Sequence, residues 1–177
     1  GAPMLTLMGA VAGAEAVERT TGLIVSLKWP NDLIVHGRKV GGILGEMAAE
    51  GSGLRHVIFG IGINVNQTEG EFEGELRQTA SSLRLEAGHP VDRTGIVRSL
   101  CESLDRWYDR FLADGAPPIL EQARRRCLTL GRMVVARSGA QELSGLAVEL
   151  DDEGRLVIRE ARGALHRLLA GDVTLTG

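Results

Sequence analysis

Apolar runs of strand length, separated by short polar links, occupy two blocks of this 177-residue sequence. In the first block the runs cover residues 23–27, 33–35, 39–47 and 56–66. In the second block they cover residues 133–136, 146–150, 156–159, 165–169 and 173–175. Links of hairpin length, such as Asp151-Asp152-Glu153-Gly154, favour antiparallel pairing of successive strands. The first block therefore predicts antiparallel strands, and the five short runs of the second predict a small barrel of SH3-like size.

Helical spacing accounts for most of the remaining chain. The first expected helix carries its apolar face at Met4, Leu7, Met8 and Val11 and ends at Thr21-Gly22. A second helix is expected after Asp92, which can act as its N-cap. Its apolar positions are Val97, Leu100, Leu104, Trp107 and Phe111. A third helix is expected from Pro117-Pro118 to about Cys127, and the acidic stretch 67–75 is expected to be a loop.

The composition is that of an ordinary globular protein. Hydrophobic residues make up 44% of the chain and aromatic residues 3%, so the core must be aliphatic. A formal net charge of −3 gives no sign of nucleic-acid binding, and no apolar run approaches the roughly 20 residues of a membrane span. Cys101 and Cys127 are expected to be small core residues, which fits a cytoplasmic protein. We predict an α+β fold divided into residues 1–128 and residues 129–177.

The stretch Lys-Trp-Pro-Asn-Asp at residues 28–32, followed by Lys39, carries the most distinctive chemistry. Lys28 and Lys39 are candidate anion ligands, because an ammonium group is a strong point charge toward phosphate or carboxylate oxygens. Asp32 can hold one lysine in place, bind Mg²⁺, or take a proton from an incoming amine. An ordinary turn with a solvated ion pair would also fit these residues.

Other residues near this stretch could have either a structural or a functional role. Gly41 and Gly42 lack a Cβ, so either a ligand or another strand can approach their backbone. Trp29 is expected to pack in the core rather than to stack on a ligand. Gly60-Ile61-Gly62 is not a dinucleotide-binding fingerprint, since it lacks the third glycine and lies inside a strand. The four histidines show no spacing typical of metal ligands.

Taken in chain order, these segments resemble the biotin protein ligase family. The central signature matches Lys28 to Asp32 and Gly37 to Leu44, with Glu46. The next landmarks match Gly60-Ile61-Gly62-Ile63-Asn64-Val65-Asn66, Ala80-Ser81-Ser82-Leu83 and Gly171-Asp172-Val173. The resemblance implies part of a catalytic domain with a mixed sheet, similar to that of class II aminoacyl-tRNA synthetases, followed by the small SH3-like barrel. The family usually has alanine where Gly41 stands, a departure expected only to add room.

The resemblance also implies a reaction. Biotin and ATP, with Mg²⁺, give biotinyl-adenylate, and a lysine of an acceptor protein then takes the biotin. It implies catalytic roles for Lys28, Asp32 and Lys39. It implies biotin or adenylate contacts for Asn31, Lys39, Gly41, Gly42 and Asn64, with Asn64 on the nucleotide or metal side. The implied acceptor is a biotin carboxyl carrier domain, and a homodimer is a further expectation.

One family feature has no match in this sequence, the Gly-Arg-Gly-Arg loop that precedes the first helix. We therefore expect the chain to be the C-terminal part of a ligase and to be inactive alone. Whether its start, Gly1-Ala2-Pro3-Met4, is natural or added stays open. Two alternatives also stay open: a lipoate or octanoate ligase, and a non-catalytic binding protein of the same fold. The Lys-Trp-Pro-Asn-Asp string argues against the lipoate alternative.

Overall fold

The computed structural model describes residues 2–50, 53–138 and 141–176. The first part contains α1 (Ala2–Thr21), β1 (Ser26–Lys28), β2 (Asp32–Val35), β3 (Arg38–Glu50) and β4 (Gly53–Ile63). A connecting region follows with the 3-10 turn η1 (Glu69–Glu71), α2 (Leu76–Thr79), α3 (Leu83–Ala87), α4 (Arg93–Asp114) and α5 (Pro117–Arg126). The last part contains β5 (Met133–Ser138), β6 (Gln141–Leu150), β7 (Leu156–Arg159), β8 (Leu165–Leu168) and β9 (Asp172–Leu175). No described helix is long and apolar enough to cross a membrane.

The first four strands form one sheet in the order β1-β2-β3-β4, and every ladder between them is antiparallel, as the short links predicted. Parallel contacts are limited, in the described chain, to the single bridges Leu27–Cys127 and Lys39–Ala80. The mixed sheet implied by the resemblance is therefore not seen as a parallel ladder among these strands. A two-residue turn at His36 and Gly37 joins β2 to β3 with positive φ at both positions (47° and 81°), a tight hairpin geometry.

The first strand is shorter than the sequence predicted. The apolar run begins at Leu23, but ladder pairing starts only at Ser26. The Val25 N–H instead donates to Glu18 Oε1 of α1 at 3.2 Å, and Ile24 is 81% exposed. The hydrogen bond to the helix thus replaces a hydrogen bond to a neighbouring strand. The apolar run in the sequence gives no sign of this contact.

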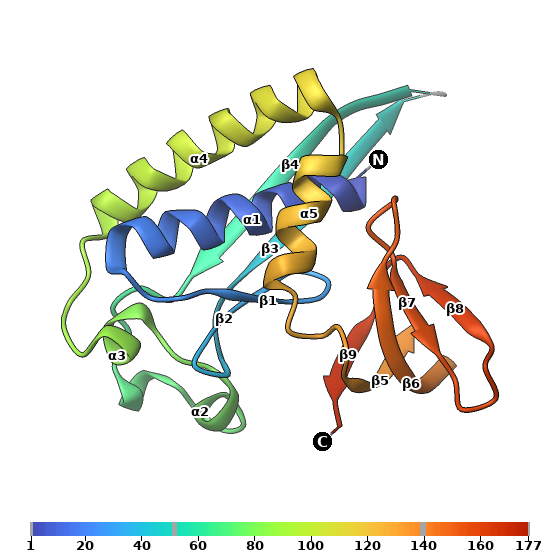
Figure 1. The fold of residues 1–177 in the computed structure, drawn as a ribbon. Coiled ribbons are helices and arrows are strands. Elements are labelled where there is room, and N and C mark those ends of the chain that lie inside the picture. The colour runs from blue at the N-terminus through green and yellow to red at the C-terminus, as the bar shows by residue number, and fades with distance from the viewer. Residues whose placement is uncertain (1, 51–52, 139–140, 177) are drawn as a thin grey trace.

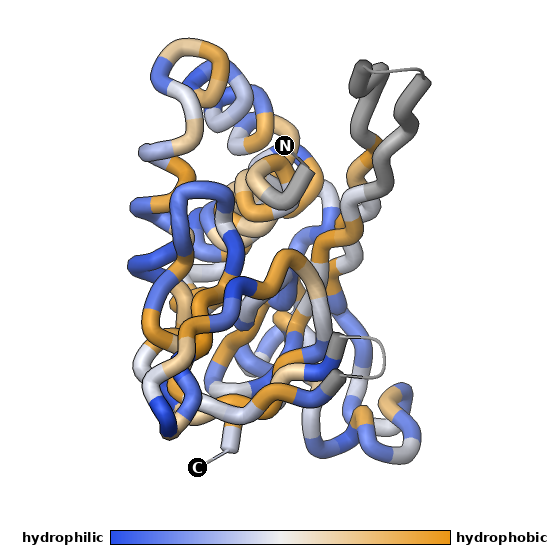
Figure 2. Tube along the Cα trace, turned by 90° about the vertical axis from the view of Figure 1, so that its right-hand side faces the viewer, coloured by the Kyte–Doolittle hydropathy of each residue, from blue (hydrophilic) through white to orange (hydrophobic). Residues whose placement is uncertain are grey.

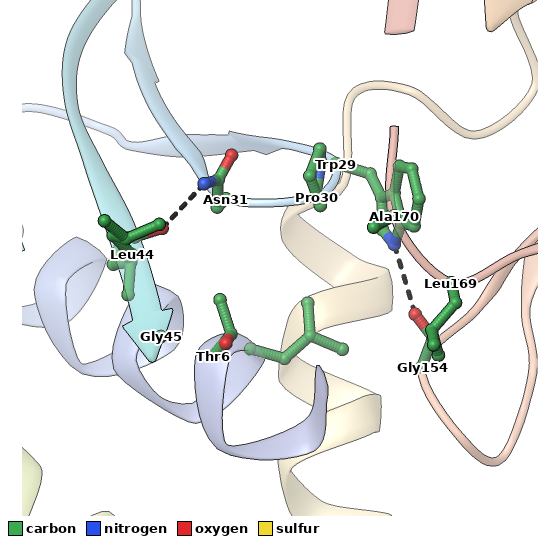
Figure 3. Close-up of a pocket in the computed structure, with 11 residues that line it drawn as sticks. Thr6, Trp29, Pro30, Asn31, Leu44, Gly45, Gly154, Leu169 and Ala170 are labelled. Carbon is green, nitrogen blue, oxygen red and sulfur yellow. Dashed lines mark hydrogen bonds between the residues drawn. The ribbon is translucent and has the colours of Figure 1, made fainter. Parts of the chain in front are cut away.

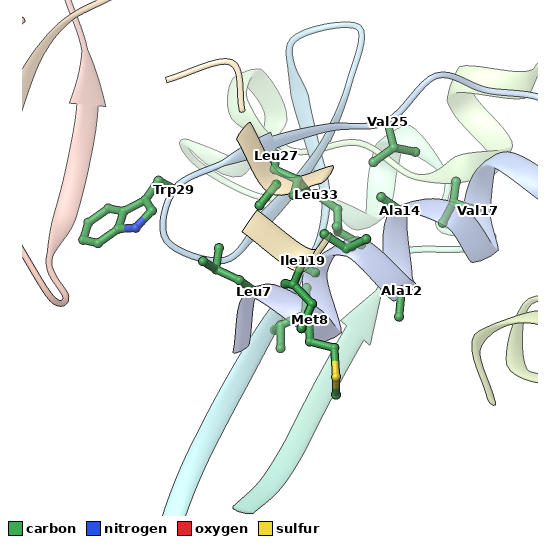
Figure 4. Packing of buried hydrophobic residues seen from close by; sticks show 14 of the residues in the cluster. Leu7, Met8, Ala12, Ala14, Val17, Val25, Leu27, Trp29, Leu33 and Ile119 are labelled. Carbon is green, nitrogen blue, oxygen red and sulfur yellow. The ribbon is translucent and has the colours of Figure 1, made fainter. Parts of the chain in front are cut away.

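Helix α1 lies across one face of the sheet, and small residues let it come close (Figures 1 and 4). A Cβ added at Gly9 would lie 3.3 Å from Ile43, and one at Gly13 would lie 3.3 Å from Leu33. Both sheet residues are fully buried, as is Val11 of the helix. In Figure 2, α1 is seen nearly end-on near the N mark, coloured toward the hydrophobic end of the scale. The aliphatic core expected from the composition is confirmed at this contact.

Helix α4 packs on α1 with much of the predicted face, since Trp107 is buried and Leu104 and Phe111 pack against the core. Asp92 caps it as expected, accepting the Thr94 N–H at 3.0 Å. Its buried residues are Ile96, Ser99, Ser103 and Trp107, whereas the predicted core position Val97 is 58% exposed. Two serines at the contact allow close approach, so the buried stripe runs through small polar residues that a search for apolar periodicity passes over. Cys101, on the outer side, is exposed, and its expected core role was wrong.

The last five strands form a second antiparallel sheet in the order β8-β7-β6-β5-β9. Four lie close to where the sequence placed them, whereas β6 begins at Gln141 rather than at Leu146, and the turn at residues 151–154 joins β6 to β7. Val134, Ala136, Ala147 and Ile158 form the buried side of this sheet. Barrel closure would need β8 to pair with β9, and no such ladder occurs among the described residues. The closed barrel and the boundary at residue 128 stay predictions.

Trp29 joins the two sheets (Figure 3). It is 3% exposed, which confirms its expected place in the core. Its backbone N–H donates to the hydroxyl of Thr129 at 3.1 Å, and its indole Nε1–H donates to the carbonyl of Gly154 at 3.1 Å. Leu128 N also donates to Leu27 O at 2.9 Å. The turn that carries Lys28 and Asp32 is thereby held against the C-terminal strands.

Thr129→Val should therefore destabilise the protein by about 1–3 kcal/mol, because it keeps the side-chain shape but leaves the buried Trp29 N–H without an acceptor. Urea unfolding at equilibrium measures this. Thr174→Val, an exposed position on β9, is the matched control and should be near neutral. An equal effect of the two substitutions would show that the Thr129 hydrogen bond does not hold this junction.

Candidate active site

One row of residues crosses all four strands on the face opposite α1. The registers pair Lys28 with Asp32, Asp32 with Gly42, and Gly42 with Gly62. Residues directly opposite each other in an antiparallel ladder point to the same side. The row thus begins with a cation and an anion and continues as two glycines, so charged groups stand beside an open stretch of backbone.

A β-bulge brings Lys39 to the same face. The pairing of β2 with β3 shifts from Ile34–Lys39 to Leu33–Gly41, which leaves Val40 as an extra residue. In a regular strand Lys39 would share a face with Gly41, but the extra residue reverses that alternation. Lys39 Nζ consequently lies 2.5 Å from Asp32 Oδ1, with the two side chains 48% and 18% exposed. The sequence proposed both residues, but only the bulge makes them partners.

A shallow open recess of about 410 Å³ lies beside this pair. Its lining comprises Asn31, Lys39, Gly42, Ile43, Leu44, Gly60, Ile61 and Gly62. A Cβ at Gly42 would contact the Asp32 carboxylate and Lys39 Cε, both at 3.5 Å, so this glycine lies directly under the ion pair. Leu44 is 58% exposed on the same face. The recess combines a charged end with an apolar floor, which suits a mainly apolar molecule that carries one anionic group.

The two predicted asparagines are placed differently. Asn31 borders the recess, but its Nδ2 donates to Ile43 O at 2.6 Å and its own carbonyl accepts from Ile43 N at 2.9 Å, so it braces the turn against β3 (Figure 3). Asn64 follows β4 and donates from Nδ2 to Ser81 O at 3.0 Å. Its Oδ1 accepts no hydrogen bond within the described part of the chain. Asn64 therefore has one acceptor left for a ligand.

Lys28 is half-buried across from Asp32 and has no ion pair among the described residues. Lys28 and Lys39 are the only lysines in the sequence, and the other 18 basic residues are arginines. A lysine is a compact point charge, whereas arginine offers a planar fork. Because the chain uses arginine at its other basic positions, the two lysines are candidates for a role that needs a compact point charge. Counting the lysines would have provided this signal from the sequence.

The bulge at Lys39 is supported by a segment that the sequence treated only as a landmark. Ser81 N donates to Lys39 O at 2.8 Å, and Asn64 N donates to Val40 O at 2.8 Å. Nearby on α3, Glu86 binds His36 and Arg38 of the β2–β3 hairpin. Partial burial works to raise the pKa of Glu86, but the nearby Ser81 hydroxyl, the contact with His36 and the charge of Arg38 bring it below its ordinary value.

Gly41, expected to contact the substrate, lies elsewhere. It is buried on the side that faces α1, and a Cβ there would stand 2.6 Å from Gly62 O. The expectation that glycine at this position only adds room was wrong, because the space is filled by the backbone of β4. Of the two predicted glycines, Gly42 lines the recess.

A second cavity, of about 280 Å³, adjoins the recess at the junction of the two sheets (Figure 3). Asn31, Ile43 and Leu44 line both spaces. The far wall comes from Gly154, Leu169 and Ala170 of the C-terminal part. The turn between β1 and β2 thus borders both the charged recess and the apolar cavity.

Gly41→Ala should destabilise the protein by about 1–3 kcal/mol, because the new methyl group would displace β4 backbone. The matched control is Gly62→Ala, where an added Cβ meets nothing within 4 Å. Thermal or urea unfolding of the two variants should therefore separate them clearly. Equal stability would mean that the strands shift apart at little cost.

Comparisons with known proteins identify the family of the chain. The sequence model of the Biotin/lipoate A/B protein ligase family matches residues 1–64, and that of the Biotin protein ligase C terminal domain matches residues 129–175. The chain is 36% identical over 173 residues to the bifunctional ligase/repressor BirA of Bacillus subtilis, covering 98% of this chain but 53% of that protein. It therefore spans about half the length of that relative.

Another relative is covered more fully. The biotin--[acetyl-CoA-carboxylase] ligase of Paracoccus denitrificans is 32% identical over 165 residues, 92% of this chain and 69% of that protein. Among solved structures, biotin protein ligase from Aquifex aeolicus in complex with biotin and ATP superposes with a TM-score of 0.83 at 28% identity, covering 98% of this chain and 71% of that one. On these matches, together with the lysine-bearing turn and its recess, the chain belongs to the biotin protein ligase family.

Proposed function

We propose that the protein containing this chain attaches biotin to a lysine of an acceptor protein, in two steps that use ATP. The observation that carries the proposal is the Lys39–Asp32 pair, 2.5 Å apart beside a recess with glycine and leucine at its floor. Biotin has this mixed character along its side chain, an apolar aliphatic segment that ends in a carboxylate. The solved relative in complex with biotin and ATP supports the same substrates.

In the first step, a carboxylate oxygen of biotin attacks the α-phosphorus of ATP. The bond to the β-phosphate breaks, and pyrophosphate leaves with its electron pair. The Lys39 ammonium group stabilises the negative charge that builds on the oxygens around phosphorus. Mg²⁺ would accompany the phosphates, since it is commonly held by substrate phosphates and one or two protein oxygens. Asn64 Oδ1 fits as one such oxygen.

In the second step, the acceptor lysine amine attacks the acyl carbon of biotinyl-adenylate. An amide forms, AMP leaves, and the amine loses a proton. A lysine amine has an unperturbed pKa of about 10.4, so a base must help remove that proton near neutral pH. Asp32 lies on the correct face to accept it, with Lys28 beside it. A biotin carboxyl carrier domain in the cytoplasm is the proposed acceptor, and a homodimer remains a further proposal.

Lys39→Ala in the full gene product should abolish adenylate formation, a loss of at least about 100-fold, because it removes the charge placed at the reacting phosphate. Pyrophosphate release with biotin and ATP measures the first step, and lipoate tested in parallel separates the lipoate ligase alternative. Stability should change little, since the side chain is half-exposed. Near-normal biotinylation by this variant would contradict the assigned role.

The 177-residue chain by itself belongs in the same assay. We propose that it is inactive, because the recess faces outward with Leu44 58% exposed and offers no opposite wall among the described residues. Pyrophosphate release above background by this chain would contradict that proposal without affecting the Lys39 assignment.

Asp32→Asn should bind biotin and ATP nearly as well as the unaltered protein, yet transfer biotin to the acceptor at least about 100-fold more slowly. The neutral amide keeps the size of the carboxylate but cannot take a proton. Isothermal titration gives binding, and single-turnover transfer from preformed adenylate gives the second step. Loss of binding with unchanged transfer would make Asp32 a structural or metal-binding residue.

A further inference from the structure

We infer that Glu86 is a positioning residue of the ligase site, which acts through Arg38 and His36 to keep Lys39 aimed at Asp32. The inference rests on the proposed function of Lys39. It concerns a residue outside the signature stretch, 40 or more positions along the chain from the site lysines. Glu86 lies on α3, which sits at the end of the sheet where β2 turns into β3 (Figure 1).

The bulge creates the need for such support. Normal ladder pairing fixes a strand residue from both sides, but the shift between Leu33 and Ile34 removes one regular pair at the position next to Lys39. The carbonyls of Lys39 and Val40 are taken instead by the N–H groups of Ser81 and Asn64, both at 2.8 Å. The aim of Lys39 therefore depends on where the segment from Ser81 to α3 is held.

Glu86 holds that segment to the hairpin. Its two carboxylate oxygens bind separate partners: Oε2 lies 2.7 Å from His36 Nδ1, and Oε1 lies 2.6 Å from Arg38 Nη2. The Glu86 side chain is only 4% exposed, whereas those of His36 and Arg38 are 66% and 41% exposed. A buried carboxylate needs partners to offset its lost hydration, so these two contacts are strongly coupled to the position of α3.

The position of Glu86 affects Lys39 because the two partners of Glu86 lie just before Lys39 in the sequence. Arg38 is the residue immediately before Lys39, and His36 forms the turn that leads into it. Both are tied through one carboxylate to the segment that also binds the Lys39 carbonyl. Glu86 is absent from the lining of the recess and contacts no proposed reacting group. Its effect should therefore appear in the chemical step rather than in substrate binding.

The test compares Glu86→Gln and Glu86→Asp with the unaltered full gene product. Glu86→Gln keeps the size but loses the charge, and should lower kcat for adenylate formation by about tenfold or more, since small misplacements of a catalytic group carry large rate costs. The KM values for biotin and ATP should stay within about twofold. Glu86→Asp keeps the charge but is one methylene shorter, so its kcat should fall between the other two.

A second measurement does not depend on enzyme turnover. The amine of Lys39 should react more slowly than that of Lys28 with an acetylating reagent, because the Asp32 carboxylate lies 2.5 Å from its Nζ and blocks approach of the reagent. Mass spectrometry of the peptides that carry these two lysines gives the ratio. In Glu86→Gln the reactivity of Lys39 relative to Lys28 should rise severalfold.

His36→Asn provides a second test in case the Glu86 variants do not fold. It removes one of the Glu86 contacts at an exposed position, and Asn tolerates the positive φ there. It should lower kcat by a smaller factor than Glu86→Gln, with the thermal midpoint nearly unchanged. The matched control is Glu121→Gln on α5, which breaks an ion pair with Arg125 at 2.5 Å, a length similar to the Glu86 contacts, and should leave both readouts unaltered.

The outcomes separate the two proposals. Unchanged kcat and unchanged Lys39 labelling in folded Glu86 variants would overturn the positioning role. Altered KM with normal kcat would do the same, because it would place Glu86 in substrate binding. If the unaltered protein makes no biotinyl-adenylate, the proposed function fails, and the labelling ratio alone then decides whether Glu86 positions Lys39.

Discussion

The burial of one face of the four-stranded sheet under α1 sets the direction of the side chains on the other face. Leu33 and Ile43 must point toward the helix, where Gly9 and Gly13 make room for them. Their neighbours along each strand then point the opposite way, because side chains alternate across a sheet. Asp32, one residue before Leu33, is placed on the open face by this constraint alone.

Lys39 is the exception to simple alternation. It reaches the open face because a bulge adds one residue to β3, and that bulge leaves backbone groups that a regular ladder would have used. The groups are paired by Ser81 and Asn64 from a later part of the chain. The direction of the Lys39 side chain is thus set by a local break in the sheet, and tertiary contacts pair the backbone groups at that break.

The C-terminal strands hold the same turn from the other side. Trp29 lies between Lys28 and Asp32 in the signature, yet it binds no proposed substrate; its two N–H groups are bound by Thr129 and Gly154. The signature therefore combines a residue with a structural role and residues with a proposed catalytic role. The charged ones, Lys28 and Asp32, share the open face of the sheet with Gly42, while the tryptophan fixes the turn to the second sheet and lines the apolar cavity at the junction.

Sequence alone determined the order of the elements and most of the strands, and it proposed the charged residues of the site, since apolar runs, turn residues and charged motifs are local features. It missed Ser99 and Ser103 in the buried stripe of α4, because they carry no apolar signal, and it expected Gly41 to contact the substrate although β4 fills that space. Tertiary structure decided which groups meet. The bulge that joins Lys39 to Asp32, and the burial of Glu86 against the hairpin, depend on contacts between distant segments that no local pattern encodes.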